Sequence, residues 1–206
     1  MLCVPTSRKS AIFMVFKESV TPEEIESLEL IAFDGPITVI TARGKDFDEA
    51  IRHLSSSRII GFDTETKPIF NNKAHRNGTA LLQLSSETNA YLFRLQMLGL
   101  PAELARILAD NSITKVGAAV ADDIRGLQRY VDFRAARFMD LQAFAERYGI
   151  KDKSVKKLTA IILGRKVSKA QQLSNWEAPE LSRAQQLYAA TDAWICLKMY
   201  KALLGA

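Results

Sequence analysis

The sequence is poor in the residues that cross-link small proteins or build histidine-rich metal sites. Its 206 residues include two cysteines, Cys3 and Cys196, and two histidines, His53 and His75. Two such separated cysteines form no disulfide framework of the kind found in small secreted domains, which fits a reducing compartment. Two histidines are too few for a histidine-rich zinc site. Any bound metal is therefore expected to have oxygen ligands, as magnesium and manganese do.

The N-terminal region lacks an apolar run long enough for a targeting or membrane segment. Residues 11–16 are apolar, but they are bracketed by Lys9 and Lys17. Such a short run is neither the core of a signal peptide nor a membrane span. We expect a cytoplasmic protein with no membrane partner, and the sequence leaves open whether Met1 or Met14 is the native start.

Composition indicates one globular domain and an anionic partner. Hydrophobic residues make up 48% of the chain, enough for one substantial core. We expect an N-terminal extension over residues 1–20 and a single domain over residues 21–206. Lysine and arginine outnumber aspartate and glutamate by 28 to 23, which gives a net charge of +5 and favours a partner such as nucleic acid.

The stretch from Ile59 to Thr66 is the centre of the predicted fold. Its apolar first half, Ile59 to Phe62, is typical of a strand buried on both faces of a sheet. Alternation along the strand places Asp63 and Glu65 on one face, roughly 7 Å apart. Ligands of such sheets bind at the carboxyl ends of strands, so the pair is a candidate cation site. A solvated strand end is the alternative interpretation.

The remaining pattern predicts an α/β fold with a mixed sheet. Five strands are expected, at residues 37–41, 59–66, 79–85, 90–93 and 114–116. Helices are expected at residues 21–30, 46–55, 101–109, 122–130, 140–148, 154–163 and 181–204. The middle three strands follow one another closely, which predicts an antiparallel meander within the sheet.

Two other places offer acidic side chains. Asp122 and Asp123 begin a predicted helix, where one of them could simply act as a cap. Tyr188 and Asp192 are spaced i and i+4, so both project from one face of the last helix. Together with the strand pair these positions supply four carboxylates and a tyrosine, the set that a two-metal phosphodiesterase site requires.

These residues carry a family resemblance. The stretch Phe62-Asp63-Thr64-Glu65, then Val116-Gly117 with Asp123 and Leu127, then Tyr188 to Asp192, resemble in their order the three motifs of the DEDD superfamily of 3′-5′ exonucleases. The tyrosine variant (DEDDy) is indicated, because the histidine variant would carry histidine where this chain has Leu187. Ribonuclease D and the Werner syndrome exonuclease domain belong to this branch, and the resemblance spans about residues 37–204.

The resemblance implies a fold, a reaction and cofactors. It implies a ribonuclease H-like domain with the mixed five-stranded sheet flanked by helices. It also implies a metal-dependent 3′-5′ exonuclease that uses two divalent ions, Mg²⁺ or Mn²⁺, and releases nucleoside 5′-monophosphates from DNA or RNA with a free 3′ end. The choice between DNA and RNA, single strands and duplex ends, the processivity, the oligomeric state and any targeting partners stay open.

The same resemblance implies roles for individual residues. Asp63, Glu65, Asp123 and Asp192 would bind the metal ions, and Tyr188 would position the attacking water. The choice of Asp123 depends on using Gly117 and Leu127 as anchors, and Asp122 is the alternative.

Four further residues are candidates for contacts to substrate. The candidates are Thr64, Lys67, Lys169 and Trp176, although Trp176 could instead be an anchor of the core. A basic stretch at residues 151–169 is a candidate phosphate-facing surface, with a solvated helix face as the alternative. It contains Lys151, Lys153, Lys156, Lys157, Arg165 and Lys166, against the acidic Asp152.

Two other functions are compatible with parts of this pattern. A nucleic-acid-binding module on the same fold could have lost catalysis, although no carboxylate of the motifs is missing. A metal-dependent phosphatase acting on small nucleotides would cleave mononucleotides and ignore polymers.

Overall fold

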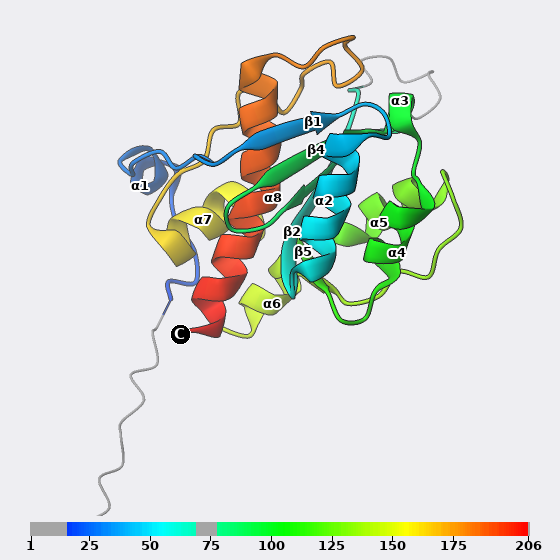
Figure 1. The fold of residues 1–206 in the computed structure, drawn as a ribbon. Helices are drawn as coiled ribbons and strands as arrows, with labels where there is room; N and C mark the ends of the chain where they lie inside the picture. Colours follow the sequence, from blue (N-terminus) through cyan, green and yellow to red (C-terminus); the bar gives the residue numbers. More distant parts are fainter. Residues whose placement is uncertain (1–15, 69–77, 206) are drawn as a thin grey trace, which may run out of the picture.

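A mixed sheet of six strands forms the middle of the molecule (Figure 1). The computed structural model describes residues 16–68 and 78–205, so residues 1–15, with most of the expected extension and Cys3, lie outside the described part, as does His75. The strands lie in the order β1-β4-β3-β2-β5-β6. Their bounds are β1 Ile37–Ile40, β2 Ile59–Thr66, β3 Thr79–Ser85, β4 Ala90–Arg94, β5 Thr114–Gly117 and β6 Phe138–Asp140.

The predicted meander is confirmed and the predicted strand number is wrong. β3 runs antiparallel to both β2 and β4, whereas β1 pairs in parallel with β4, and β5 in parallel with both β2 and β6. The sixth strand, β6, has three half-buried residues, Phe138 to Asp140. A segment of this length shows neither an alternating pattern nor a continuous buried run, so its sequence does not indicate a strand.

Helices cover both faces of the sheet. Their bounds are α1 Pro22–Glu26, α2 Lys45–Ser56, α3 Leu95–Leu98, α4 Ala102–Ala109, α5 Val120–Gln128, α6 Leu141–Glu146, α7 Val155–Leu163 and α8 Arg183–Leu204. The capping box predicted at Thr21 is present, but α1 ends at Glu26 rather than near Leu30, which instead forms a β-bridge with Lys166. The described residues include no helix that is both long and apolar enough to cross a membrane.

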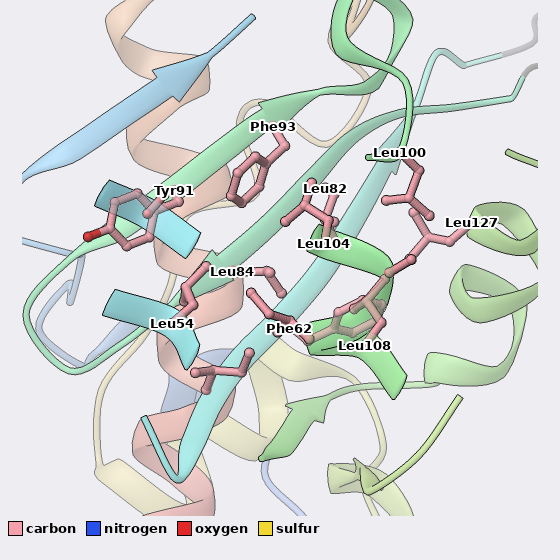
Figure 2. Close-up of a cluster of buried hydrophobic side chains, with 14 of the residues drawn as sticks. Leu54, Phe62, Leu82, Leu84, Tyr91, Phe93, Leu100, Leu104, Leu108 and Leu127 are labelled. Atoms are coloured by element: carbon pink, nitrogen blue, oxygen red, sulfur yellow. The ribbon is translucent and has the colours of Figure 1, made fainter. Parts of the chain in front are cut away.

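Alternation along β2 and β3 divides the core into two layers. Phe62, Leu82 and Leu84 face α2 and α4, in a cluster that also contains Leu54, Phe93, Leu104, Leu108 and Leu127 (Figure 2). The opposite face of the sheet lies against α8, which packs on β2, β3, β4 and β5. The carboxylates of β2 must therefore lie on the α8 side, because they alternate with Phe62.

Residues 16–20 are attached to the domain rather than separate from it. Val20 is buried, and its backbone N–H donates to Asp152 Oδ2 at 2.9 Å. The carbonyl oxygen of Glu18 accepts from the backbone N–H of Lys151 at 2.7 Å. The described part of the expected extension thus packs beside the segment that leads into α7.

Candidate active site

The end of β2 and the middle of α8 bring three carboxylates together. Asp63 and Glu65 extend from β2, and Asp192 extends from α8 above them; each is partly buried. One carboxylate oxygen of each lies within 4.8 Å of the others. This oxygen-only set fits a hard divalent cation such as Mg²⁺ or Mn²⁺.

Burial and mutual repulsion raise the pKa values of these three carboxyl groups, so they retain protons more readily. Burial, followed by the charges of Asp192 and Glu65, raises the pKa of Asp63 well above its usual range. Burial and the Asp192 charge raise the pKa of Glu65 to about 9. Burial also raises the pKa of Asp192 to about 7, although a hydrogen bond from Tyr188 opposes the shift. A bound cation would remove this repulsion and restore the ionised carboxylates.

Asp123 lies next to this cluster and is connected to β2 through Thr64. The Thr64 hydroxyl donates to Asp123 Oδ1 at 2.6 Å. Burial raises the pKa of Asp123 to about 6, while that hydrogen bond lowers it. Asp122 instead points outward, with a side chain that is 84% exposed and an ion pair to Arg125. The geometry therefore favours Asp123 as the fourth carboxylate, as the motif register predicts.

Gly117 explains how α5 comes so close to β2. A Cβ on this residue would lie 2.7 Å from both the carbonyl oxygen of Phe62 and Val120 Cγ1. Only glycine fits here, because a Cβ would push the Phe62 backbone and the Val120 side chain away from this position. This close approach places Asp123, in the first turn of α5, within hydrogen-bond distance of Thr64.

Tyr188 projects from α8 beside the carboxylates. Its hydroxyl donates a hydrogen bond to Asp192, and burial together with the Asp192 charge raises the pKa of Tyr188 above its usual range. The phenol therefore stays protonated and can act as a donor.

Trp176 packs behind this tyrosine instead of facing a substrate. The two ring centroids are 6.0 Å apart, and the indole has no exposed surface. This burial supports the interpretation of Trp176 as an anchor of the core. A nucleic-acid base cannot stack on a ring that is fully enclosed.

Two pockets flank the end of β2. One has a volume of about 330 Å³ and is lined by Asp63, Glu65, Tyr188, Asp192 and Lys169, among others. The other, of about 400 Å³, is lined by residues that include Lys67, Asp123, Arg125 and Arg129. Thr64 lines both. Of the predicted substrate contacts, Thr64, Lys67 and Lys169 line these pockets, and their contact with substrate stays a prediction.

Arg125 and Arg129 were not among the candidates from the sequence. Arg125 lies on α5 and Arg129 is its C-cap residue, so their i, i+4 spacing just after the acidic pair places both on one side of the helix and was the available signal. Lys67 also forms an ion pair with Glu177 at 3.1 Å.

The basic stretch of residues 151–169 is mostly neutralised within the protein. Six of its basic side chains form ion pairs: Lys151 with Glu18, Lys153 with Glu146, Lys156 and Lys166 with Glu26, Lys157 with Asp152, and Arg165 with Glu29. The solvated, ion-paired face is therefore the better interpretation of those residues of this stretch that line neither pocket. Lys156 and Lys169 both line the pocket beside the carboxylates, and the charge of Lys169 also acts on Asp192.

Fold and site together define the class of protein. A mixed six-stranded sheet flanked by helices is the fold of the ribonuclease H-like exonuclease domains that are its structural neighbours. The family model described as 3′-5′ exonuclease matches residues 39–205. The chain belongs to this 3′-5′ exonuclease family.

Individual relatives agree with this membership. The chain is 34% identical over 160 residues to exonuclease 3′-5′ domain-containing protein 2 of Drosophila melanogaster, a match that covers 76% of this chain and 27% of that protein. It is 33% identical over 156 residues to the bifunctional 3′-5′ exonuclease/ATP-dependent helicase WRN of Mus musculus, covering 73% of this chain and 11% of that protein. The chain thus spans about a quarter or less of the length of these relatives.

A solved structure supports the fold. The Trypanosoma brucei RNase D complex with RNA U12 superposes with a TM-score of 0.73 at 20% identity, covering 84% of this chain and 64% of that chain.

Proposed function

We propose that this chain is a metal-dependent 3′-5′ exonuclease that hydrolyses phosphodiester bonds at the 3′ end of DNA or RNA and releases nucleoside 5′-monophosphates. The observation that carries the proposal is the meeting of Asp63, Glu65 and Asp192 within 4.8 Å in a pocket shared with Tyr188. Membership of the exonuclease family supports the reaction type.

The carboxylates would hold two divalent ions. Asp63, Glu65 and Asp192 would provide the main ligands, and Asp123 would contribute from the Thr64 side. Bound divalent ions supply Lewis acidity that activates water and stabilises the leaving oxygen of a phosphodiester. Because Mg²⁺ and Mn²⁺ prefer oxygen ligands, the site needs no histidine.

The other side chains orient the reactants. The Tyr188 hydroxyl, kept protonated by its environment, would position the attacking water through a hydrogen bond rather than deprotonate it. Lys169 would bring positive charge to the substrate phosphate from the pocket wall. Thr64 would hold Asp123 in place through its 2.6 Å hydrogen bond.

A nucleic acid with a free 3′ end is the proposed substrate. The net charge of +5 and the placement of Lys67, Arg125 and Arg129 around the second pocket support an anionic polymer that continues beyond the scissile phosphate. The Trypanosoma brucei RNase D structure is a complex with RNA U12, and the proposal for this chain covers both DNA and RNA.

The test uses DNA and RNA strands labelled at the 3′ or the 5′ end and incubated with Mg²⁺, Mn²⁺ or chelator. A metal-dependent ladder that shortens from the 3′ end is expected, and the Asp63→Ala and Asp192→Ala proteins should lose it while staying folded. The Asp132→Asn protein is the matched control, because Asp132 is exposed and lines neither pocket. Binding without cleavage would favour the non-catalytic module, and cleavage of mononucleotides alone would favour the phosphatase.

A further inference from the structure

Gln83 on β3 is a fully buried amide that the proposed reaction does not use. It is 0% exposed, and neither its nitrogen nor its oxygen has a hydrogen-bond partner among residues 16–68 and 78–205. Buried side-chain amides in folded proteins are normally hydrogen-bonded, so this one calls for a partner.

The position of Gln83 in the sheet identifies its nearest acidic neighbour. In the antiparallel pairing of β2 with β3, Gln83 lies directly opposite Asp63. Residues paired in this way share a face of the sheet, with Cβ atoms about 5 Å apart. On its other side Gln83 pairs with Leu92 of β4, which offers no polar side-chain atom.

Both residues face α8. Leu81, two residues before Gln83, packs with Ala189 of α8, and Ser85, two residues after it, lies beside Gly61 beneath Ala193. Alternation therefore directs Gln83 to the same side as Asp63 and Asp192. The amide lies beneath the carboxylate cluster and out of reach of solvent.

We propose that Gln83 is a positioning residue for Asp63: its side-chain N–H donates to the Asp63 carboxylate when a divalent cation is bound, and so fixes the orientation of that ligand. The inference depends on the metal site of the proposed function. Carboxylates that bind metals are commonly held by such hydrogen bonds, and removal of the donor typically weakens metal binding by 10- to 100-fold. Gln83 would not touch the substrate.

Calorimetric titration of the whole chain with Mn²⁺, without nucleic acid, tests the inference. Gln83→Met keeps the length of the side chain and removes its polar atoms, and it should weaken Mn²⁺ binding about 10-fold. Its melting temperature in EDTA should equal or exceed that of the wild type, because the lost amide had no protein partner. Ser85→Ala is the matched control: its hydroxyl is also buried without a partner on β3, but it lies opposite Gly61, and Mn²⁺ affinity should not change.

Three outcomes would overturn the inference. One is wild-type Mn²⁺ affinity in Gln83→Met. Another is an affinity loss accompanied by a lower melting temperature in EDTA, because that pattern indicates a purely structural amide. A third is an equal loss of affinity in Ser85→Ala.

A measurement on the unmutated protein decides the matter if Gln83→Met does not fold. The side-chain amide protons of Gln83 should move downfield in NMR spectra as Mg²⁺ is added, and an unchanged resonance at saturating Mg²⁺ would refute the hydrogen bond.

The failure of the inference is distinguishable from failure of the proposed function. If the wild type binds Mn²⁺, Asp63→Ala does not, and Gln83→Met binds like the wild type, only the role of Gln83 is refuted. If the wild type itself does not bind Mn²⁺, both proposals fall.

Discussion

Gly61 of β2 and Ala193 of α8 are in backbone contact: a Cβ on Gly61 would overlap the carbonyl oxygen of Ala193 and lie 2.5 Å from Ser85 Oγ. Asp63 follows Gly61 by two residues, and Asp192 directly precedes Ala193. The distance between strand and helix at this contact therefore determines how closely the two carboxylates approach.

Gly61→Ala should consequently separate β2 from α8. We expect a loss of about 3 kcal/mol or more in the free energy of unfolding, because a methyl group would be forced against rigid backbone. Mn²⁺ affinity should fall as well, since Asp63 and Asp192 move apart. Urea unfolding and calorimetry measure the two effects.

Gly78→Ala is the control for this substitution. A Cβ on Gly78 would have the Tyr130 hydroxyl as its nearest neighbour, at an ordinary 3.8 Å. Its effect on stability should stay within about 0.5 kcal/mol. Equal effects of the two substitutions would show that the strand and helix contact does not constrain the site.

The two neighbouring aspartates of α5 should differ sharply. Asp123→Asn should reduce kcat about 100-fold or more, since loss of a metal ligand costs several kcal/mol of transition-state stabilisation. Asp122→Asn should change it less than about twofold, because the Asp122 side chain is 84% exposed and pairs with Arg125. Single-turnover rates on a 3′-labelled strand measure both. A larger effect at Asp122 would shift the motif register by one residue.

The sequence predicted the site better than its surroundings. The strand alternation that places Asp63 and Glu65 together and the helical spacing of Tyr188 and Asp192 are local patterns, so they could be read from the chain. The ion pairs of Lys151 with Glu18 and of Lys156 with Glu26 join residues more than 100 positions apart, and composition alone gives no sign of them. The burial of Trp176 is likewise a consequence of tertiary packing.

The same limit applies to Gln83 and Ser85. Their position on a fully buried strand conflicts with their polarity, and this conflict is visible in the sequence only once the strand is known to be covered on both faces. The pairing of Gln83 with Asp63 further requires the register of β2 against β3.

Tyr188→Phe should slow the chemical step without abolishing it. Loss of the hydroxyl removes the donor to Asp192 and the proposed contact to the attacking water, and kcat should fall about 10- to 100-fold. KM should change little, because Trp176 still packs against the aromatic ring. Tyr200→Phe, on the same helix, is the control and should keep wild-type kcat. An unchanged kcat in Tyr188→Phe would remove the hydroxyl from the mechanism.

The stability of the metal-free protein should depend on pH through the carboxylate cluster. Glu65 has a pKa of about 9 in the folded protein against an ordinary 4.5, and Asp192 has about 7 against 3.8. Both folded values are raised, so the folded protein binds protons that the unfolded chain releases. The stabilisation is complete below the ordinary values, is lost progressively as the pH rises above them, and is gone once the pH has passed about 7 for Asp192 and about 9 for Glu65. In EDTA the melting temperature should fall by at least about 3 °C between pH 6 and pH 9.

Saturating Mg²⁺ should reduce that fall, because the cation binds the ionised carboxylates and favours the folded state more strongly as the pH rises. Asp192→Asn separates this effect from the titration of the rest of the chain. It removes one charge from the cluster, so the variant in EDTA should melt at a higher temperature than the wild type at pH 9, with a smaller dependence on pH. Asp122→Asn removes an exposed carboxylate, so its melting temperature should depend on pH as that of the wild type does. If the melting temperature of Asp192→Asn in EDTA showed the same pH dependence as that of the wild type, repulsion among Asp63, Glu65 and Asp192 would not be its source.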